Sequence, residues 1–179
     1  MKKLTIFLLV ASTLAAITSA SAAFEPGKFY LGPSVGLAWR GLGLGVNGEY
    51  AYNKNWGFGG ELSYTGFSDS YSGFGYTYKW KYTFVGGLAY GAYHFILKNN
   101  EKLDPFVKAG LGYFHWSADY SDNAGNTYAH LYGAGYSSGV GITGAAGIRY
   151  AFSPKLLGRL QVGYPFYISA GVDFPLGGK

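Results

Sequence analysis

The sequence predicts an all-β fold, an eight-stranded antiparallel up-and-down transmembrane β-barrel, on three observations. Eight stretches alternate large apolar or aromatic side chains with glycine, small polar residues and a few charges. Charged residues make up 13% of the chain and aromatic residues 20%, a composition from which a water-facing surface is hard to build. Aromatic residues also gather near both ends of the apolar rows, as in the girdles of an outer-membrane barrel.

A leader precedes this pattern. Lys2 and Lys3 are followed by an apolar run from Leu4 to Ile17 and then by small residues up to Ala22, which is the plan of a secretory signal peptide. The run is too short to be a stable membrane anchor. We therefore expect cleavage after Ala22, so that residues 1–22 are a signal peptide and residues 23–179 form one barrel domain.

Composition and charge exclude several classes of function. The chain has no cysteine, so it has no disulfide framework and no thiol chemistry. Its net charge of +5 includes Lys2 and Lys3, which leave with the leader, and the remaining excess is weak and scattered. Binding to nucleic acid is therefore not expected, and no cofactor is expected either.

The strands are predicted from alternation alone. Their approximate ranges are 29–39, 42–52, 56–64, 79–95, 106–116, 140–152, 156–164 and 168–174. In the third strand, Trp56, Phe58 and Leu62 share one face. In the fourth, the row that begins with Trp80 and Tyr82 is predicted to face lipid, with Lys79 and Lys81 on the other side.

We interpret the apolar rows as lipid-facing and the polar rows as lining the lumen. The polar rows consist mostly of small residues, which suits a narrow lumen, and their few charges have both signs and are able to pair. The expected lumen network is Glu49, Glu61, Lys79, Lys81, Lys108, Arg149, Arg159 and Asp173. Eight strands enclose a lumen that side chains fill, so a diffusion pore is not expected.

Connection lengths predict the orientation of the barrel. Residues 53–55, 97–105 and 153–155 connect strands on one side, which we assign to the periplasm together with both termini. The long segments Thr65–Tyr78 and Ala118–Tyr136 lie on the other side and are rich in tyrosine and small residues, a chemistry typical of recognition surfaces. The candidate binding residues are Phe67, Tyr71, Phe74, Tyr76, Tyr120, Tyr128 and Tyr132. Alternatively, these segments only extend the strands above the bilayer, with aromatic packing.

Over the whole mature chain, this pattern resembles the small eight-stranded outer-membrane proteins, the group that includes OmpX, Ail and the membrane domain of OmpA. The resemblance implies a bacterial outer-membrane location amid lipid and lipopolysaccharide, and folding by the barrel assembly machinery. It also implies roles in envelope integrity, adhesion or resistance to host defences. We therefore expect a non-enzymatic protein with a structural or adhesin-like role, in which the outer loops bind extracellular ligands. A soluble β-barrel carrier is an alternative, because alternation alone does not say which face is outside.

A second alternative is a lipid A-modifying enzyme. His115 and Ser117 share a strand face and resemble the His-x-Ser pair of the PagL-like lipid A deacylases, in which the histidine is the general base and the serine the nucleophile. Ala118 departs from that family, which has asparagine at the corresponding position.

No metal site is expected. The oxygen-rich group Asp119, Asp122, Asn123 and Asn126 would suit calcium, but it lacks the glutamate and the spacing of an EF-hand. The three histidines of the chain are not expected to converge.

Overall fold

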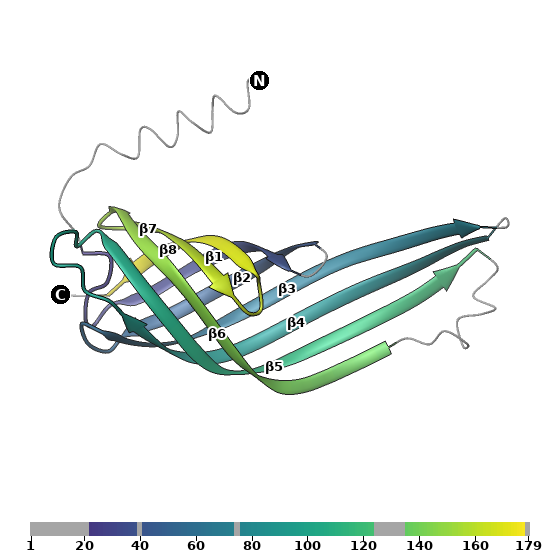
Figure 1. Cartoon of the computed structure of the whole chain (residues 1–179), viewed down its shortest axis with the longest axis horizontal. Helices are drawn as coiled ribbons and strands as arrows, with labels where there is room; N and C mark the ends of the chain where they lie inside the picture. Colours follow the sequence, from purple (N-terminus) through teal and green to yellow (C-terminus); the bar gives the residue numbers. More distant parts are fainter. Residues whose placement is uncertain (1–21, 39–40, 74–75, 124–134, 178–179) are drawn as a thin grey trace, which may run out of the picture.

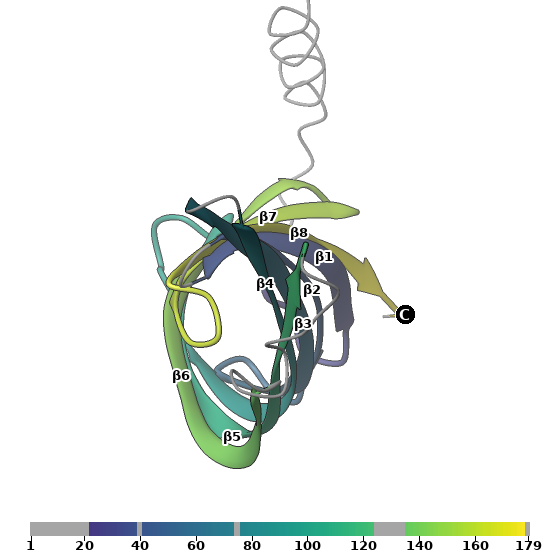
Figure 2. The same cartoon turned by 90° about the vertical axis from the view of Figure 1, so that its right-hand side faces the viewer.

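The computed structural model describes residues 22–38, 41–73, 76–123 and 135–177. These residues form eight antiparallel strands in a closed ring, in which each strand pairs with its neighbours in chain order and β1 pairs with β8. The strands are β1 (Phe29–Ala38), β2 (Gly41–Ala51), β3 (Trp56–Gly73), β4 (Tyr76–His94), β5 (Leu103–Asp122), β6 (Gly135–Ser153), β7 (Leu156–Gly163) and β8 (Ile168–Leu176). Figures 1 and 2 show the ring from the side and along its strands.

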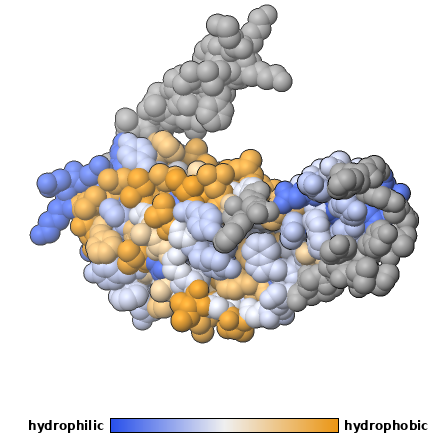
Figure 3. Space-filling view, turned by 45° about the vertical axis from the view of Figure 1, so that its right-hand side comes forward, coloured by the Kyte–Doolittle hydropathy of each residue, from blue (hydrophilic) through white to orange (hydrophobic). Residues whose placement is uncertain are grey.

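The ring is apolar outside and polar inside. Outward-facing side chains such as Leu44, Leu62, Leu111 and Val162 are more than half exposed, which is the arrangement that lipid requires. Figure 3 shows hydrophobic residues over the body of the barrel and hydrophilic ones toward its ends. Within the described residues, no helix is both long and apolar enough to cross a membrane.

The two halves of the ring differ in length. Strands β3 to β6 have 18, 19, 20 and 19 residues, whereas β1, β2, β7 and β8 have 10, 11, 8 and 9. The pairing of β2 with β3 ends at Gly43 and Thr65, and that of β7 with β6 ends at Gly163 and Ala145. Past these pairs the four long strands continue alone.

We call this continuation the projecting sheet; it consists of residues 66–73, 76–83, 116–122 and 135–144. It forms the right-hand end of the molecule in Figure 1. The opposite end, with the tight turns, residue 22 and the end of β8, is the turn end. Most of the predicted loop Thr65–Tyr78 is therefore strand, and β5 continues to Asp122, because the two hairpin arms keep pairing after they leave the ring.

The predicted facing of the side chains agrees with the structure in every strand but one. In β4, Phe84, Leu88 and Tyr90 are buried in the lumen, whereas Val85 is exposed on the outside. The prediction for β4 was therefore wrong: the side chains expected to face lipid point into the lumen, and those expected in the lumen point outward. The cause is that the alternation of the projecting part, with Trp80 and Tyr82 opposite two lysines, was extended downward into the bilayer, where the polarity of the two faces is reversed.

Candidate functional site

The lumen near the turn end holds a network of buried charges. Arg149 is fully buried and donates from Nη2 to Glu49 Oε2 at 2.6 Å and from Nε to Asp173 Oδ2 at 2.8 Å. Arg159 Nε lies 3.2 Å from the same Asp173 oxygen. A separate pair joins Lys108 Nζ to Glu61 Oε2 at 2.7 Å, with Lys108 6% and Glu61 2% exposed.

His94 completes this network. Its Nε2 lies 2.7 Å from Glu49 Oε1, and its Nδ1 lies 2.8 Å from Asp104 Oδ2. An ionised carboxylate only accepts hydrogen bonds, so contact with two carboxylates favours the form of His94 with a proton on both ring nitrogens. The cationic His94, Lys108, Arg149 and Arg159 then balance four carboxylates, those of Glu49, Glu61, Asp104 and Asp173, so that the lumen charges neutralise one another.

The structure places six of the eight predicted network residues in the lumen. Lys79 and Lys81 are the exceptions: both are exposed on the outer face of the projecting sheet, as a consequence of the reversed facing of β4. Sequence reasoning missed Asp104 and His94. Asp104 has the parity of Lys108 and would have been found had the fifth strand been started three residues earlier, whereas His94 was hidden by the wrong facing of its strand.

Aromatic side chains close the lumen at the level where the short strands end. Phe166, from the connection between β7 and β8, is 2% exposed and lies inside the ring. It fits because Gly36 and Gly43 leave room for it: a methyl group at either glycine would overlap its ring. Phe84 and Phe114 lie beside each other with ring centroids 6.0 Å apart. The sequence held no signal for Phe166, which sits in a connection.

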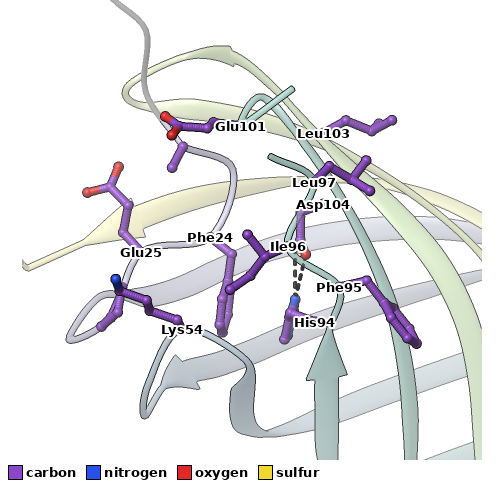
Figure 4. Close-up of a pocket in the computed structure, with 12 residues that line it drawn as sticks. Phe24, Glu25, Lys54, His94, Phe95, Ile96, Leu97, Glu101, Leu103 and Asp104 are labelled. Atoms are coloured by element: carbon purple, nitrogen blue, oxygen red, sulfur yellow. Dashed lines mark hydrogen bonds and ion pairs between the residues drawn. The ribbon is translucent and has the colours of Figure 1, made fainter. Parts of the chain in front are cut away.

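The N-terminal segment closes the turn end. The Phe24 ring stacks on the His94 ring at 3.5 Å, and the Ala23 N–H donates to the Glu101 carbonyl at 2.9 Å. A pocket of about 270 Å³ remains beside this segment, lined in part by Lys54 and Glu101 (Figure 4). Because the ring nitrogens of His94 already face carboxylates, we interpret Phe24 as a plug over the charge network.

The inner face of the projecting sheet is aromatic. The side-chain alternation continues from the ring without a register shift, so the residues that share the lumen parity point to this face. They include Phe67, Tyr71, Tyr78, Trp80, Tyr82, Trp116 and Tyr120. Among the described residues no opposite wall covers them, because β1, β2, β7 and β8 end below.

The rings of this face are in contact. Phe67 stacks on Tyr82 with centroids 4.8 Å apart, and Trp80 meets Tyr120 edge-to-face at 5.0 Å. Tyr71, Tyr78, Trp80 and Tyr120 line an open hollow of about 240 Å³. The arrangement is therefore that of an exposed aromatic surface with a hollow in it, the usual composition of a binding surface.

The structure describes three of the seven predicted loop-binding residues in full, Phe67, Tyr71 and Tyr120, and brings them to this one face. The backbone of Tyr76 begins β4. Phe74, Tyr128 and Tyr132 lie outside the described residues, as does Asn126 of the calcium candidate. Asp119 and Asp122 point to opposite faces of β5, so these two carboxylates do not converge on one ion.

His115 lies on the outer face of β5, at the base of the projecting sheet. Its Nδ1 is 2.5 Å from Ser138 Oγ on β6, so this hydrogen bond joins two neighbouring strands. Ser117 shares the outer face with His115, as the alternation predicted. Both residues are half-buried.

Comparison with known proteins identifies the fold. No curated protein sequence matches the chain. The N-terminal β-barrel domain of OprF from Pseudomonas aeruginosa superposes with a TM-score of 0.59 at 13% identity, over 84% of this chain and 98% of that one. OprG from the same organism gives 0.53 at 14% identity over 86% and 92%, and Neisserial surface protein A gives 0.51 at 15% over 83% and 96%. At these identities the likeness establishes the fold alone.

A family model settles the assignment. The outer membrane protein beta-barrel domain matches residues 7–175, which is nearly the whole chain. Since the alternating strands, the apolar exterior and the closed ring of the structure are those of such a barrel, the chain belongs to this family of bacterial outer-membrane proteins.

Proposed function

We propose that the chain is a non-enzymatic surface protein whose projecting sheet faces away from the cell and binds extracellular ligands. The observation that carries this proposal is the aromatic inner face, which stands beyond the ring and, in the part of the chain that the structure describes, has no opposite strand to cover it. The orientation is supported by the turn end, because short connections are typical of the periplasmic side of such barrels. In this membrane the exterior contacts lipid and lipopolysaccharide, and we expect the barrel assembly machinery to insert the chain.

The filled lumen favours binding over transport. Ion pairs among buried side chains occupy its turn end, with Arg149 at the centre, and Phe166 occupies its other end. An eight-stranded ring leaves little more than the volume of its own side chains. A structural or binding role therefore fits the described residues better than bulk diffusion.

A soluble carrier is excluded by the outer-membrane family and by the exterior. Leu62 and Leu111 are 66% and 61% exposed on the outside of the ring, and the outward rows of the other strands are similarly apolar. A water-soluble barrel would bury such rows.

Removal of the projecting hairpin tests the binding role. Gly66 lies opposite Thr83, so residues 67–82 are replaced by an Asn-Gly turn, which joins these two residues as a regular hairpin. We expect cells that display this variant to lose attachment to surfaces coated with basic, acidic or neutral peptides or with glycans. The folded variant should retain the heat-dependent gel mobility of a barrel, because the ring is untouched.

Ser70→Ala, an exposed position on the outer face of the same hairpin, is the matched control and should attach like the native protein. If the shortened barrel is folded and attaches as strongly as the native one, the projecting hairpin is not the binding element.

A further inference from the structure

The hollow of the projecting sheet is built from the faces and edges of aromatic rings. Tyr71 from β3, Tyr78 and Trp80 from β4 and Tyr120 from β5 surround about 240 Å³. Tyr78 and Tyr120 lie with centroids 6.2 Å apart, and Trp80 crosses Tyr120 at 62°. Three strands thus fix the rings, while Tyr71, which is 71% exposed, leaves the hollow open to the outside.

Charge separates the two faces of this sheet. Asp69 lies opposite Trp80, and Asp122 lies opposite Tyr78, so both carboxylates share the aromatic face. Lys79, Lys81 and Asp119 lie on the other face, which therefore carries an excess of positive charge. Among the described residues of the projecting sheet, the aromatic face bears carboxylates and no lysine or arginine. Aromatic ring faces are themselves electron-rich, so both features of this face favour a positive ligand.

We propose that this hollow binds the guanidinium group of an arginine on a basic peptide. This inference rests on the proposed binding role of the projecting sheet and names its ligand class. A guanidinium is flat and weakly hydrated, so it stacks on tyrosine and tryptophan rings and still donates hydrogen bonds in its plane. Asp69 and Asp122 lie on the same face as the rings, so their negative charge favours a cationic side chain there.

The shape of the site favours a peptide side chain over other cations. The hollow is open at Tyr71, which is 71% exposed, so a side chain carried by a peptide is able to enter it. A lysine ammonium is a strongly hydrated point charge and gains less from stacking. A neutral sugar would stack on the rings but would gain nothing from the charge of the two carboxylates.

Binding of matched peptides to the mature protein in lipid nanodiscs tests the inference. The probe is a fluorescent peptide with three arginines separated by serines, compared with the same peptide carrying citrulline or lysine in place of arginine. We expect the arginine peptide to bind most tightly and the citrulline peptide, which has the same shape without the charge, to lose binding. Equal affinity for arginine and citrulline would overturn the inference.

Variants locate the binding. Trp80→Ala should weaken the arginine peptide about 2- to 30-fold, the range expected for loss of a cation–π contact. Tyr71→Ala, at an exposed position where folding is not at risk, should weaken it in the same direction, and Ser70→Ala on the opposite face should not change it. Native affinity in both aromatic variants would place the peptide elsewhere. Displacement by tetramethylammonium but not by free guanidinium, or binding of neutral oligosaccharides in preference to the peptide, would also overturn the inference.

The two proposals fail in different ways. If the barrel shortened at residues 67–82 still attaches to coated surfaces, the projecting sheet is not the binding element and both proposals fall. If the shortened barrel loses attachment but the arginine peptide does not bind the native protein, only the ligand class is wrong.

Discussion

The projecting sheet is made of four of the eight strands of the ring, β3 to β6, yet its faces have the opposite polarity to those of the ring. Within the ring, β3 presents Leu62 outward and Glu61 inward. Above it, the same strand presents Ser70 outward and Tyr71 inward. The pleat continues without interruption, and what changes is the medium on each side: lipid outside and ion pairs inside the ring, and water on both sides of the projecting sheet.

This difference shows that the alternation of apolar and polar side chains along a strand assigns its two faces differently inside and outside the bilayer. In the bilayer an outward charge costs free energy, so charges turn inward and pair. Beyond the bilayer that cost vanishes, and Lys79 and Lys81 face outward while the rings gather on the concave side. Aromatic residues on that side are not required by the membrane, which leaves recognition as a reason for their presence.

Removing a lumen charge should have the largest effect on stability. Arg149→Met leaves Glu49 and Asp173 buried without their main partner, and breaking a buried ion pair in this way costs about 3–5 kcal/mol. The measurement is the free energy of unfolding in urea, followed by tryptophan fluorescence in lipid vesicles.

The matching change in the projecting sheet is Lys81→Met. Its side chain is exposed, so the free energy of unfolding should change by less than about 0.5 kcal/mol. Equal losses for the two variants would contradict the distinction between the two regions.

Arginine substitutions at two outward-facing positions of β3 sharpen the comparison, because they locate the edge of the bilayer. Leu62 and Ser68 both point outward, but Leu62 lies in the ring opposite Val46, and Ser68 lies above it opposite Lys81. Leu62→Arg should cost about 2–4 kcal/mol of unfolding free energy, the cost of a charge near the middle of the bilayer. Ser68→Arg should cost close to nothing in the same vesicle assay. A similar cost at both positions would mean that lipid also covers the projecting sheet.

The fold followed from the sequence wherever a strand stays in one medium. Alternation in β1, β2 and β5 to β8, and in the ring part of β3, assigned both faces correctly, because lipid outside and paired charges inside leave few alternatives. It failed in β4, whose strongest signal, Trp80 and Tyr82 against Lys79 and Lys81, comes from outside the bilayer. Strand length was missed for the same reason: tyrosine, serine and glycine serve equally well in a loop and in a water-exposed strand.

The site was only partly accessible from the sequence. Tyr71 and Tyr120 were candidates by composition, but their convergence with Trp80 depends on the register between three strands, which composition does not fix. Phe166 was out of reach, since a residue in a connection has no periodicity to place it. Asp104 and His94 become evident only once the ends of their strands are known.

The smallest expected effect concerns His115. A hydrolase would need this histidine as a base beside a serine, and the structure shows its Nδ1 hydrogen-bonded to Ser138 at the outer rim. We expect cells that express the native protein to have the same lipid A mass spectrum as cells without it, and His115→Ala and Ser117→Ala to leave that spectrum unchanged. A loss of lipid A acyl chains that needs the native protein and disappears in either variant would show that the rim is catalytic. Since both substitutions leave the ring and the aromatic face intact, binding of the arginine peptide should persist in them, which separates the chemistry of the rim from the recognition assigned to the sheet above it.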